Sequence, residues 1–267
     1  MQTFSPESTE PAGDTDGDPV AQFLRDVAAP LRARGRPQRP DPLPKASQLL
    51  AEALRARRIR VKKVVEGRWV FEFAGTVIGG YSLTGPPGDA RPRSGGGVTT
   101  LVSSHARRVL RDAERVRMHF DLMEIPHPAP LPESAADEIT PPLFDIELLA
   151  PGANSSTLPL RAYAVGRETI SLLAVVPDED GGILTVDVTD RAAEEIRSLA
   201  VDAMRAIPGL FAAAVALEVE SLDRAEGAQV VGIDETASIV PHHFPGLGTG
   251  RPVADAIAEQ MLFTAAL

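Results

Sequence analysis

The chain has 267 residues, of which 43% are hydrophobic and 24% charged, and its formal net charge at pH 7 is −10. These proportions are typical of a soluble protein long enough to form one large domain or two small ones. The absence of cysteine excludes disulfides, thiol catalysis and cysteine-ligated zinc. The acidic charge argues against nucleic acid as a partner. Without a long apolar run or a basic start followed by an apolar stretch, we expect no membrane association and a cytoplasmic location.

The N-terminal part of the chain predicts little regular structure. Residues 1–18 are acidic and rich in serine, threonine, proline and glycine, a composition that predicts disorder. The apolar spacing in Val20–Leu31 predicts a short helix that ends near Pro30. Arg32–Pro44 is expected to be a linker, because its prolines prevent regular structure.

Basic residues are concentrated between Arg25 and Lys63, with few acidic residues among them. A phosphate-rich or acidic partner can use such a segment. The favoured interpretation is a solvated helix face and a basic linker, since no aromatic residues alternate with the charges. A binding module for an acidic partner is the weaker alternative.

Periodicity in the middle of the chain predicts a helix, an antiparallel sheet and a second helix. Apolar residues recur at helical spacing in the two helical segments and alternate in the strand segments. The expected elements are a helix over Lys45–Arg58 capped by Ser47, strands over Ile59–Val65, Arg68–Ala74 and Gly75–Leu83 with a turn at Glu66-Gly67, a loop over Gly85–Gly97, and a helix over Ser103–Met123.

The C-terminal part predicts a compact unit of strands and helices. Pro128–Pro159 is polar and rich in proline, so we expect it to be mostly irregular. The elements expected after it are strands over Leu160–Val165, Thr169–Val176, Ile183–Val188, Ala213–Glu220 and Gln229–Asp234, a helix over Arg191–Ile207 capped by Asp190, and a final helix over Val253–Phe263.

The segment Val230–Phe263 carries the most informative motif. The residues that carry the motif are Pro241, His242, His243, Phe244, Pro245, Gly248, Arg251, Val253 and Ala254. This pattern resembles the end of an ATP-grasp carboxylate–amine ligase, where a strand ending in Glu-x-Asn precedes a proline, a histidine, a Gly-x-x-Arg turn and a helix. Leu49–Phe73, Thr99–Pro130 and Leu160–Leu262 resemble segments of the same ligases, those related to cyanophycin synthetase and the dipeptide and glutathione-type enzymes, in the same order.

The resemblance implies an α+β fold that is ATP-grasp-like and truncated. It consists of a small N-terminal α/β subdomain and a C-terminal mixed or antiparallel sheet with packed helices. The expected division is a disordered tail, short helix and linker at 1–44, an N-terminal subdomain at 45–130, a proline-rich connector at 131–159 and a C-terminal subdomain at 160–267.

The departures from the family pattern bear on function. The family places two lysines and a glycine-rich loop on a central subdomain, but Leu131–Pro159 is too short for it and has no lysine. Ala216 stands where the family has an aspartate, and the Glu-x-Asn motif reads Asp234-Glu235-Thr236. The leading hypothesis is therefore a non-catalytic partner or substrate-binding subunit of a carboxylate–amine ligase system. The alternative is an active ligase with a divergent nucleotide site, and only that alternative implies magnesium and ATP.

The resemblance also supplies the candidate site residues, although it names no catalytic residue. Arg161 and Arg251 resemble the arginines that hold phosphate or carboxylate, a role suited to a guanidinium. Asp234 and Glu235 are the candidate magnesium ligands, but alternation along a strand points them to opposite faces.

His242 and His243 are the candidate substrate-binding residues, with a structural role in the turn as the favoured reading. The expected partners are an intact ATP-grasp ligase or a second copy of the chain, and a small carboxylate or peptide as ligand. No nucleic acid and no membrane are expected.

Overall fold

The computed structural model of the chain describes residues 18–65, 68–82, 97–129 and 156–266. The strands are β1 (Arg60–Val65), β2 (Arg68–Phe73), β3 (Thr76–Ser82), β4 (Gly97–Val98), β5 (Leu158–Val165), β6 (Glu168–Pro177), β7 (Ile183–Asp187), β8 (Ala212–Val219) and β9 (Gln229–Asp234). The helices are α1 (Pro19–Phe23), the π-helical η2 (Leu24–Ala28), α2 (Ala29–Ala33), α3 (Ala46–Ala56), α4 (Ser104–Leu110), α5 (Ala113–Leu122), α6 (Glu194–Arg205), α7 (Val240–His243) and α8 (Val253–Ala266).

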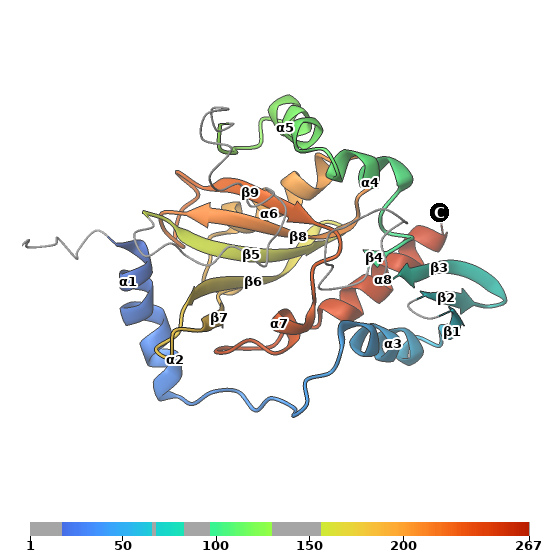
Figure 1. Cartoon of the computed structure of the whole chain (residues 1–267), viewed down its shortest axis with the longest axis horizontal. Coiled ribbons are helices and arrows are strands. Elements are labelled where there is room, and N and C mark those ends of the chain that lie inside the picture. The colour runs from blue at the N-terminus through green and yellow to red at the C-terminus, as the bar shows by residue number, and fades with distance from the viewer. Residues whose placement is uncertain (1–17, 66–67, 83–96, 130–155, 267) are drawn as a thin grey trace, which may run out of the picture.

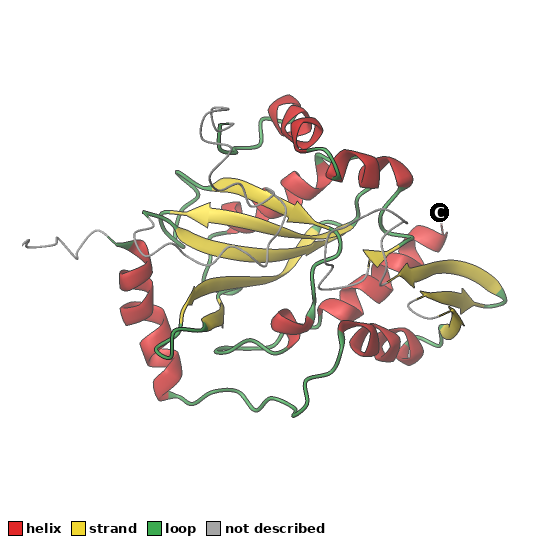
Figure 2. Cartoon of the chain, viewed as in Figure 1, coloured by secondary structure: helices red, strands yellow, loops and turns green. Residues whose placement is uncertain are grey.

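The strands form two antiparallel sheets (Figures 1 and 2). The small sheet has the order β1-β2-β3-β4, and the large sheet has the order β7-β6-β5-β8-β9. Helices surround both sheets, so the predicted α+β class is confirmed. Within the described ranges, no helix combines the length and apolar character needed to cross a membrane.

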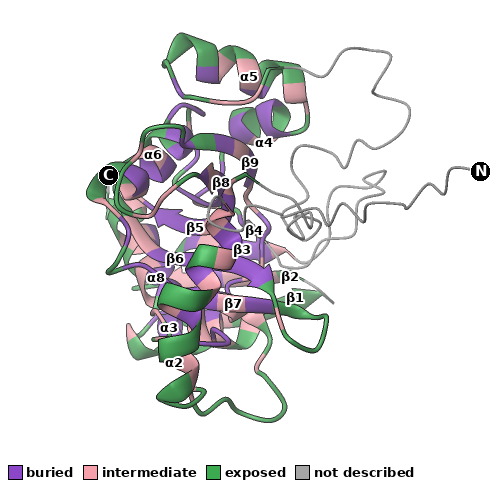
Figure 3. Cartoon of the chain, turned by 90° about the vertical axis from the view of Figure 1, so that its left-hand side faces the viewer, coloured by how far each residue is buried: buried purple, intermediate pink, exposed green. Residues whose placement is uncertain are grey.

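The large sheet lies between two apolar cores, because successive residues of a strand point to opposite faces. Leu160 and Ala162 of β5 belong to a core that includes Ile196 of α6. Tyr163 of the same strand belongs to a second core that includes Ile257 of α8. Figure 3 shows the buried strands between helices whose outer faces are exposed.

The second core also joins the small sheet to the rest of the molecule. Leu54 of α3 and Phe71 of β2 are buried in it together with Met261 of α8. At the surface, Arg57 extends this contact through ion pairs of 2.6 Å to Asp255 and 2.8 Å to Glu259. Residues from the predicted 45–130 and 160–267 segments therefore share one core.

The N-terminal helix runs further than the sequence predicts. Val20 and Phe23 are buried in the first core, and the helix continues past Pro30 to Ala33. A π-helical turn accommodates the proline: the N–H of Ala29 bonds to the carbonyl of Leu24, and Pro30 then falls in the first turn of α2. A proline there removes no helical hydrogen bond, so the predicted end near Pro30 is wrong.

The predicted Ser103–Met123 helix is two helices. Ser103 caps α4 by accepting the N–H of Ala106 at 3.0 Å, and Asp112 caps α5 by accepting the N–H of Arg115 at 3.2 Å. The apolar spacing continues across the break because residues of both helices pack into the first core. Periodicity alone does not reveal such a break.

Two predicted caps are also corrected. Asp190 lies outside α6, whose first residue follows Ala193 without a side-chain cap. Lys45 precedes α3, and its N–H donates to Gln48 at 2.7 Å, so Ser47 is not the cap. The predicted Glu66-Gly67 turn and most of the predicted 1–18, Gly85–Gly97 and Pro128–Pro159 segments lie outside the described residues.

Candidate functional site

Polar side chains gather on the face of the large sheet that is turned away from α6. Residues directly opposite each other on antiparallel strands share a face. The pairing places Asp234, Ala214, Tyr163 and Ser171 in one row across β9, β8, β5 and β6. The neighbouring row contains Gly232, Ala216, Arg161, Leu173 and Asp187.

His242 lies over these rows and is fully buried. Its Nδ1 is 2.8 Å from the hydroxyl oxygen of Ser171, and its ring meets the ring of Tyr163 edge-on with 5.4 Å between centroids. Burial, together with the charges of Arg161 and the neighbouring His243, lowers the pKa of His242 to about 3. The imidazole is therefore neutral near pH 7.

His243 has a different role in the same turn. Its Nε2 accepts the backbone N–H of Ala254 at 3.0 Å, in the first turn of α8. Burial lowers the pKa of His243, and the negative charge of Asp255 opposes that shift. A neutral imidazole that accepts a hydrogen bond from the start of a helix acts as its cap. The assignment of His242 and His243 to a substrate stays a prediction, and both side chains have structural contacts here.

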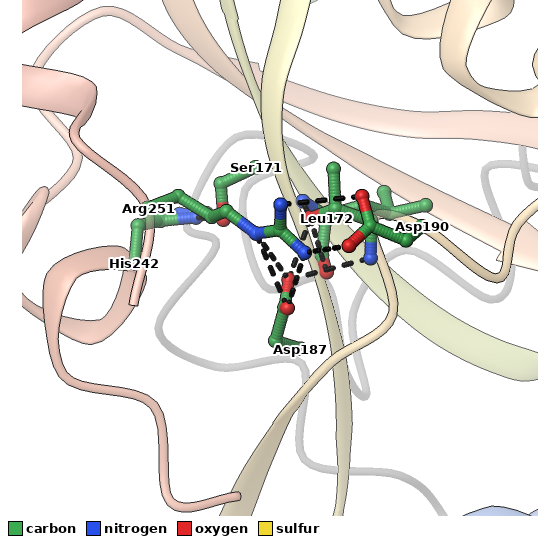
Figure 4. A network of polar contacts seen from close by, with 7 residues as sticks. Ser171, Leu172, Asp187, Asp190, His242 and Arg251 are labelled. Atoms are coloured by element: carbon green, nitrogen blue, oxygen red, sulfur yellow. Dashed lines mark hydrogen bonds and ion pairs between the residues drawn. The ribbon is translucent and has the colours of Figure 1, made fainter. Parts of the chain in front are cut away.

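Arg251 connects the C-terminal segment to the large sheet through ion pairs (Figure 4). Its Nη2 is 2.7 Å from Oδ2 of Asp187 and 2.7 Å from Oδ2 of Asp190. Hydrogen bonds to these carboxylates raise the pKa of Arg251, and the same contact lowers the pKa of Asp190. A phosphate or carboxylate ligand would reach this guanidinium only in competition with both acids.

A glycine makes this arrangement possible. A Cβ on Gly250 would lie 2.1 Å from the backbone oxygen of His243. With glycine in place, the chain folds back so that the N–H of Arg251 donates to the carbonyl of His242 at 2.8 Å. The turn between α7 and α8 thus places Arg251 beside Asp187.

The candidate metal ligands diverge at the end of β9. Oδ1 of Asp234 accepts the N–H of Thr236 at 2.6 Å and its hydroxyl at 2.7 Å. Glu235 instead borders a cavity beside the small sheet. Burial raises the pKa of Tyr163, and the negative charges of Asp234 and Glu235 add to that shift. In the described part of the chain, no group of three or more acidic, histidine or cysteine side chains is placed to hold a metal ion.

The cavity beside Glu235 is a feature that the sequence did not reveal. It has a volume of about 830 Å³ and is lined by Arg68 of β2 and by Arg107, Arg108 and Arg111 at α4. Arg107, Arg108 and Arg111 are close to one another in the sequence. No sequence pattern indicated that they line one cavity together with Arg68 of β2. We call this feature the arginine cavity.

The fold of the chain is ATP-grasp-like. A bifunctional glutathione synthetase from Pasteurella multocida superposes with a TM-score of 0.61 at 12% identity, covering 82% of this chain and 44% of that one. The ATP-grasp ligase PsnB complexed with a minimal precursor gives a TM-score of 0.32 at 11% identity, covering 40% of this chain and 34% of that one. No protein-family model and no curated protein matches the sequence.

The similarity is one of fold. The chain spans less than half the length of the glutathione synthetase, at 44%. The predicted relation to ATP-grasp folds is thus confirmed at the level of architecture, and the activity of this chain is a separate question.

Proposed function

We propose that the protein keeps an ATP-grasp-like scaffold without the ligase reaction, and that it is a partner or substrate-binding subunit of a carboxylate–amine ligase system. The partner is an intact ATP-grasp ligase or a second copy of this chain. The proposal rests on the chemistry of the polar face of the large sheet rather than on the fold, which an active ligase would share.

The surroundings of Asp234 carry the proposal. Two magnesium ions that bridge ATP phosphates need several hard oxygen ligands. The residue opposite Asp234 on β8 is Ala214, and the next residue on the same face is Ala216, so β8 supplies no oxygen side chain there. One oxygen of Asp234 is already bound by Thr236. This donor set does not fit a two-magnesium site.

The sequence between α5 and β5 supports the same conclusion. Lysines on the central subdomain of ATP-grasp ligases meet the nucleotide phosphates, and residues 123–157 of this chain contain no lysine. Arg251 on the polar face does not replace them readily, because it is bound by Asp187 and Asp190.

Thermal unfolding with and without millimolar Mg-ATP or Mg-ADP tests the proposal. A ligand present at 100 times its Kd adds about 2.7 kcal/mol to the free energy of unfolding, which raises Tm by several degrees. We expect no magnesium-dependent shift with either nucleotide and no ATP hydrolysis in the presence of amines and carboxylates. A magnesium-dependent shift together with turnover would overturn the proposal.

The second candidate function is an active ligase that forms an amide through an acyl phosphate. The position of Glu235 on the arginine cavity favours it, because a carboxylate and several cations then lie around one space. In this case Arg161 and Arg251 would hold phosphate or carboxylate, and Asp234 and Glu235 would hold magnesium. ATP hydrolysis that depends on an amine and a carboxylate and is lost in Asp234→Ala would support this function over the first.

A further inference from the structure

The arginine cavity gathers positive charge from separate parts of the chain. Arg68 comes from β2, whereas Arg107, Arg108 and Arg111 come from α4 and the residue that ends it. Figure 1 shows α4 beside the end of the small sheet that carries β3 and β4. The chain as a whole has a net charge of −10, so this local excess of arginine is not a consequence of composition.

Most of these arginines have no acidic partner among the described residues. Arg68, Arg108 and Arg111 make no ion pair or side-chain hydrogen bond within the described ranges. Other arginines of the chain are neutralised: Arg57 pairs with two acids, and so does Arg251. What distinguishes Arg68, Arg108 and Arg111 is that they line one cavity together. Like charges held close together repel one another, and an anionic ligand relieves that repulsion.

The other walls of the cavity favour anion binding. Val64 and Val77 line it and are 60% and 64% exposed, so part of the wall is apolar. An apolar wall lowers the local dielectric constant and strengthens the attraction between an arginine and an anion. Glu235 is the one acidic residue among the described side chains that line the cavity, and a carboxylate can receive an ammonium group.

We propose that the arginine cavity binds a small ligand with at least two carboxylate or phosphate groups. A guanidinium binds either group through paired hydrogen bonds, so several arginines around one space select a ligand with several anionic groups. The volume of about 830 Å³ is within the range of small-molecule sites. This inference does not rest on the proposed function, since a binding subunit and an active ligase can both hold such a ligand.

Isothermal titration calorimetry of the full chain with citrate and with pyrophosphate, without magnesium, tests the proposal. Citrate tests whether the cavity binds carboxylate groups, and pyrophosphate tests whether it binds phosphate groups. Trp69 is the one tryptophan of the chain and lines the cavity, so its fluorescence gives an independent readout. We expect at least one probe to bind, with an affinity that falls as salt is added.

The variant Arg108→Gln/Arg111→Gln tests whether the cavity is the site. We expect its affinity for the bound probe to fall at least ten-fold, because two of the arginines lose their charge. The matched control is Arg55→Gln, an exposed arginine in the last turn of α3 that lies outside the cavity, and its affinity should change less than two-fold. If circular dichroism shows that the double variant does not fold, Arg68→Gln on the exposed side of β2 replaces it.

The outcomes separate the possibilities. Binding of citrate alone or pyrophosphate alone, lost in the cavity variants, supports the proposal and identifies the anionic group. No heat and no fluorescence change with either probe at millimolar concentration would overturn it. Equal weakening by Arg55→Gln would also overturn it, because the binding would then follow net charge. A magnesium-dependent shift with ATP turnover would overturn the proposed function but would not change these magnesium-free readouts, so the two proposals fail independently.

Discussion

Two polar regions of the molecule differ in how their charges are balanced. On the large sheet, Arg251 is bound by Asp187 and Asp190, and His242 is buried against Ser171. In the arginine cavity, Arg68, Arg108 and Arg111 make no ion pair with an acid of the described residues. The first region uses its polar groups to hold the fold together, whereas the second leaves its charge available to a ligand.

The comparison shows why a family resemblance can point to residues without locating a function. The motif around His242 and Arg251 is the part of the sequence that resembles ATP-grasp ligases, and its side chains are committed to internal contacts. The arginine cavity carries no motif of the family, yet it is lined by several arginines. Stability measurements therefore separate the two regions. Substitutions on the polar face of the large sheet should lower the free energy of unfolding markedly, whereas substitutions in the arginine cavity should change it little.

Arg251→Ala should have the largest effect. It leaves the carboxylate of Asp187, whose side chain is 5% exposed, without its cation. Removing one partner of a buried ion pair costs about 3–5 kcal/mol. Urea unfolding measures this loss. The control Asp190→Asn removes an acid whose side chain is 77% exposed, and its cost should stay below about 1 kcal/mol. Equal losses in both variants would contradict the buried pairing.

The stability of the chain should fall in mild acid because of His242. In the unfolded chain a histidine takes up a proton near pH 6.5, whereas in the folded chain His242 does so only near a pKa of about 3. Protons therefore favour unfolding, and the stabilisation present above pH 6.5 is lost as the pH falls towards 3. Between pH 7 and pH 5 the loss from this residue is about 2 kcal/mol.

Urea unfolding at both pH values, in the wild type and in His242→Gln, isolates that contribution. The variant should be less stable at pH 7, but its decrease on going to pH 5 should be smaller by about 2 kcal/mol. His243, whose pKa is also lowered, remains in both proteins and shifts both curves in the same direction. Identical pH dependence in the two proteins would show that His242 is not held neutral.

His243→Ala should have a smaller effect, localised to α8. It removes the acceptor for the N–H of Ala254, and the loss of a helix cap typically costs about 1 kcal/mol. Hydrogen exchange should show faster exchange of the Ala254 amide, and urea unfolding should give the overall loss. Alanine at His105, which is exposed on α4, provides the control and should leave the Ala254 amide protected.

Arg108→Gln/Arg111→Gln should have the smallest effect on stability. Both side chains are exposed, and surface substitutions usually change the free energy of unfolding by less than about 0.5 kcal/mol. Because the substitutions reduce the repulsion among the arginines, any change in the free energy of unfolding should be a slight increase. A loss comparable to that of Arg251→Ala would mean that the arginine cavity, too, is part of the structural framework.

Much of the local structure could be predicted from the sequence, because it depends on neighbours along the chain. Alternation identified β5, β6, β8 and β9, and helical spacing identified α3, α6 and α8. The break between α4 and α5 was missed, since Asp112 begins a new helix without interrupting the apolar pattern. The continuation past Pro30 was missed because a π-helical turn places that proline where it removes no hydrogen bond.

The periodicities and the tail motif that resembles ATP-grasp ligases follow from the order of the amino acids, and they predicted the fold class. Which charges meet depends on how the elements pack in three dimensions. Asp187 and Arg251 are 64 residues apart in sequence, and Arg68 is separated from α4 by a turn of the small sheet and the residues that follow it. Ion pairs and cavities form between side chains that are distant along the chain, so their partners depend on how strands and helices pack. That packing placed Arg251 between two carboxylates and brought Arg68 and the arginines of α4 together around one cavity.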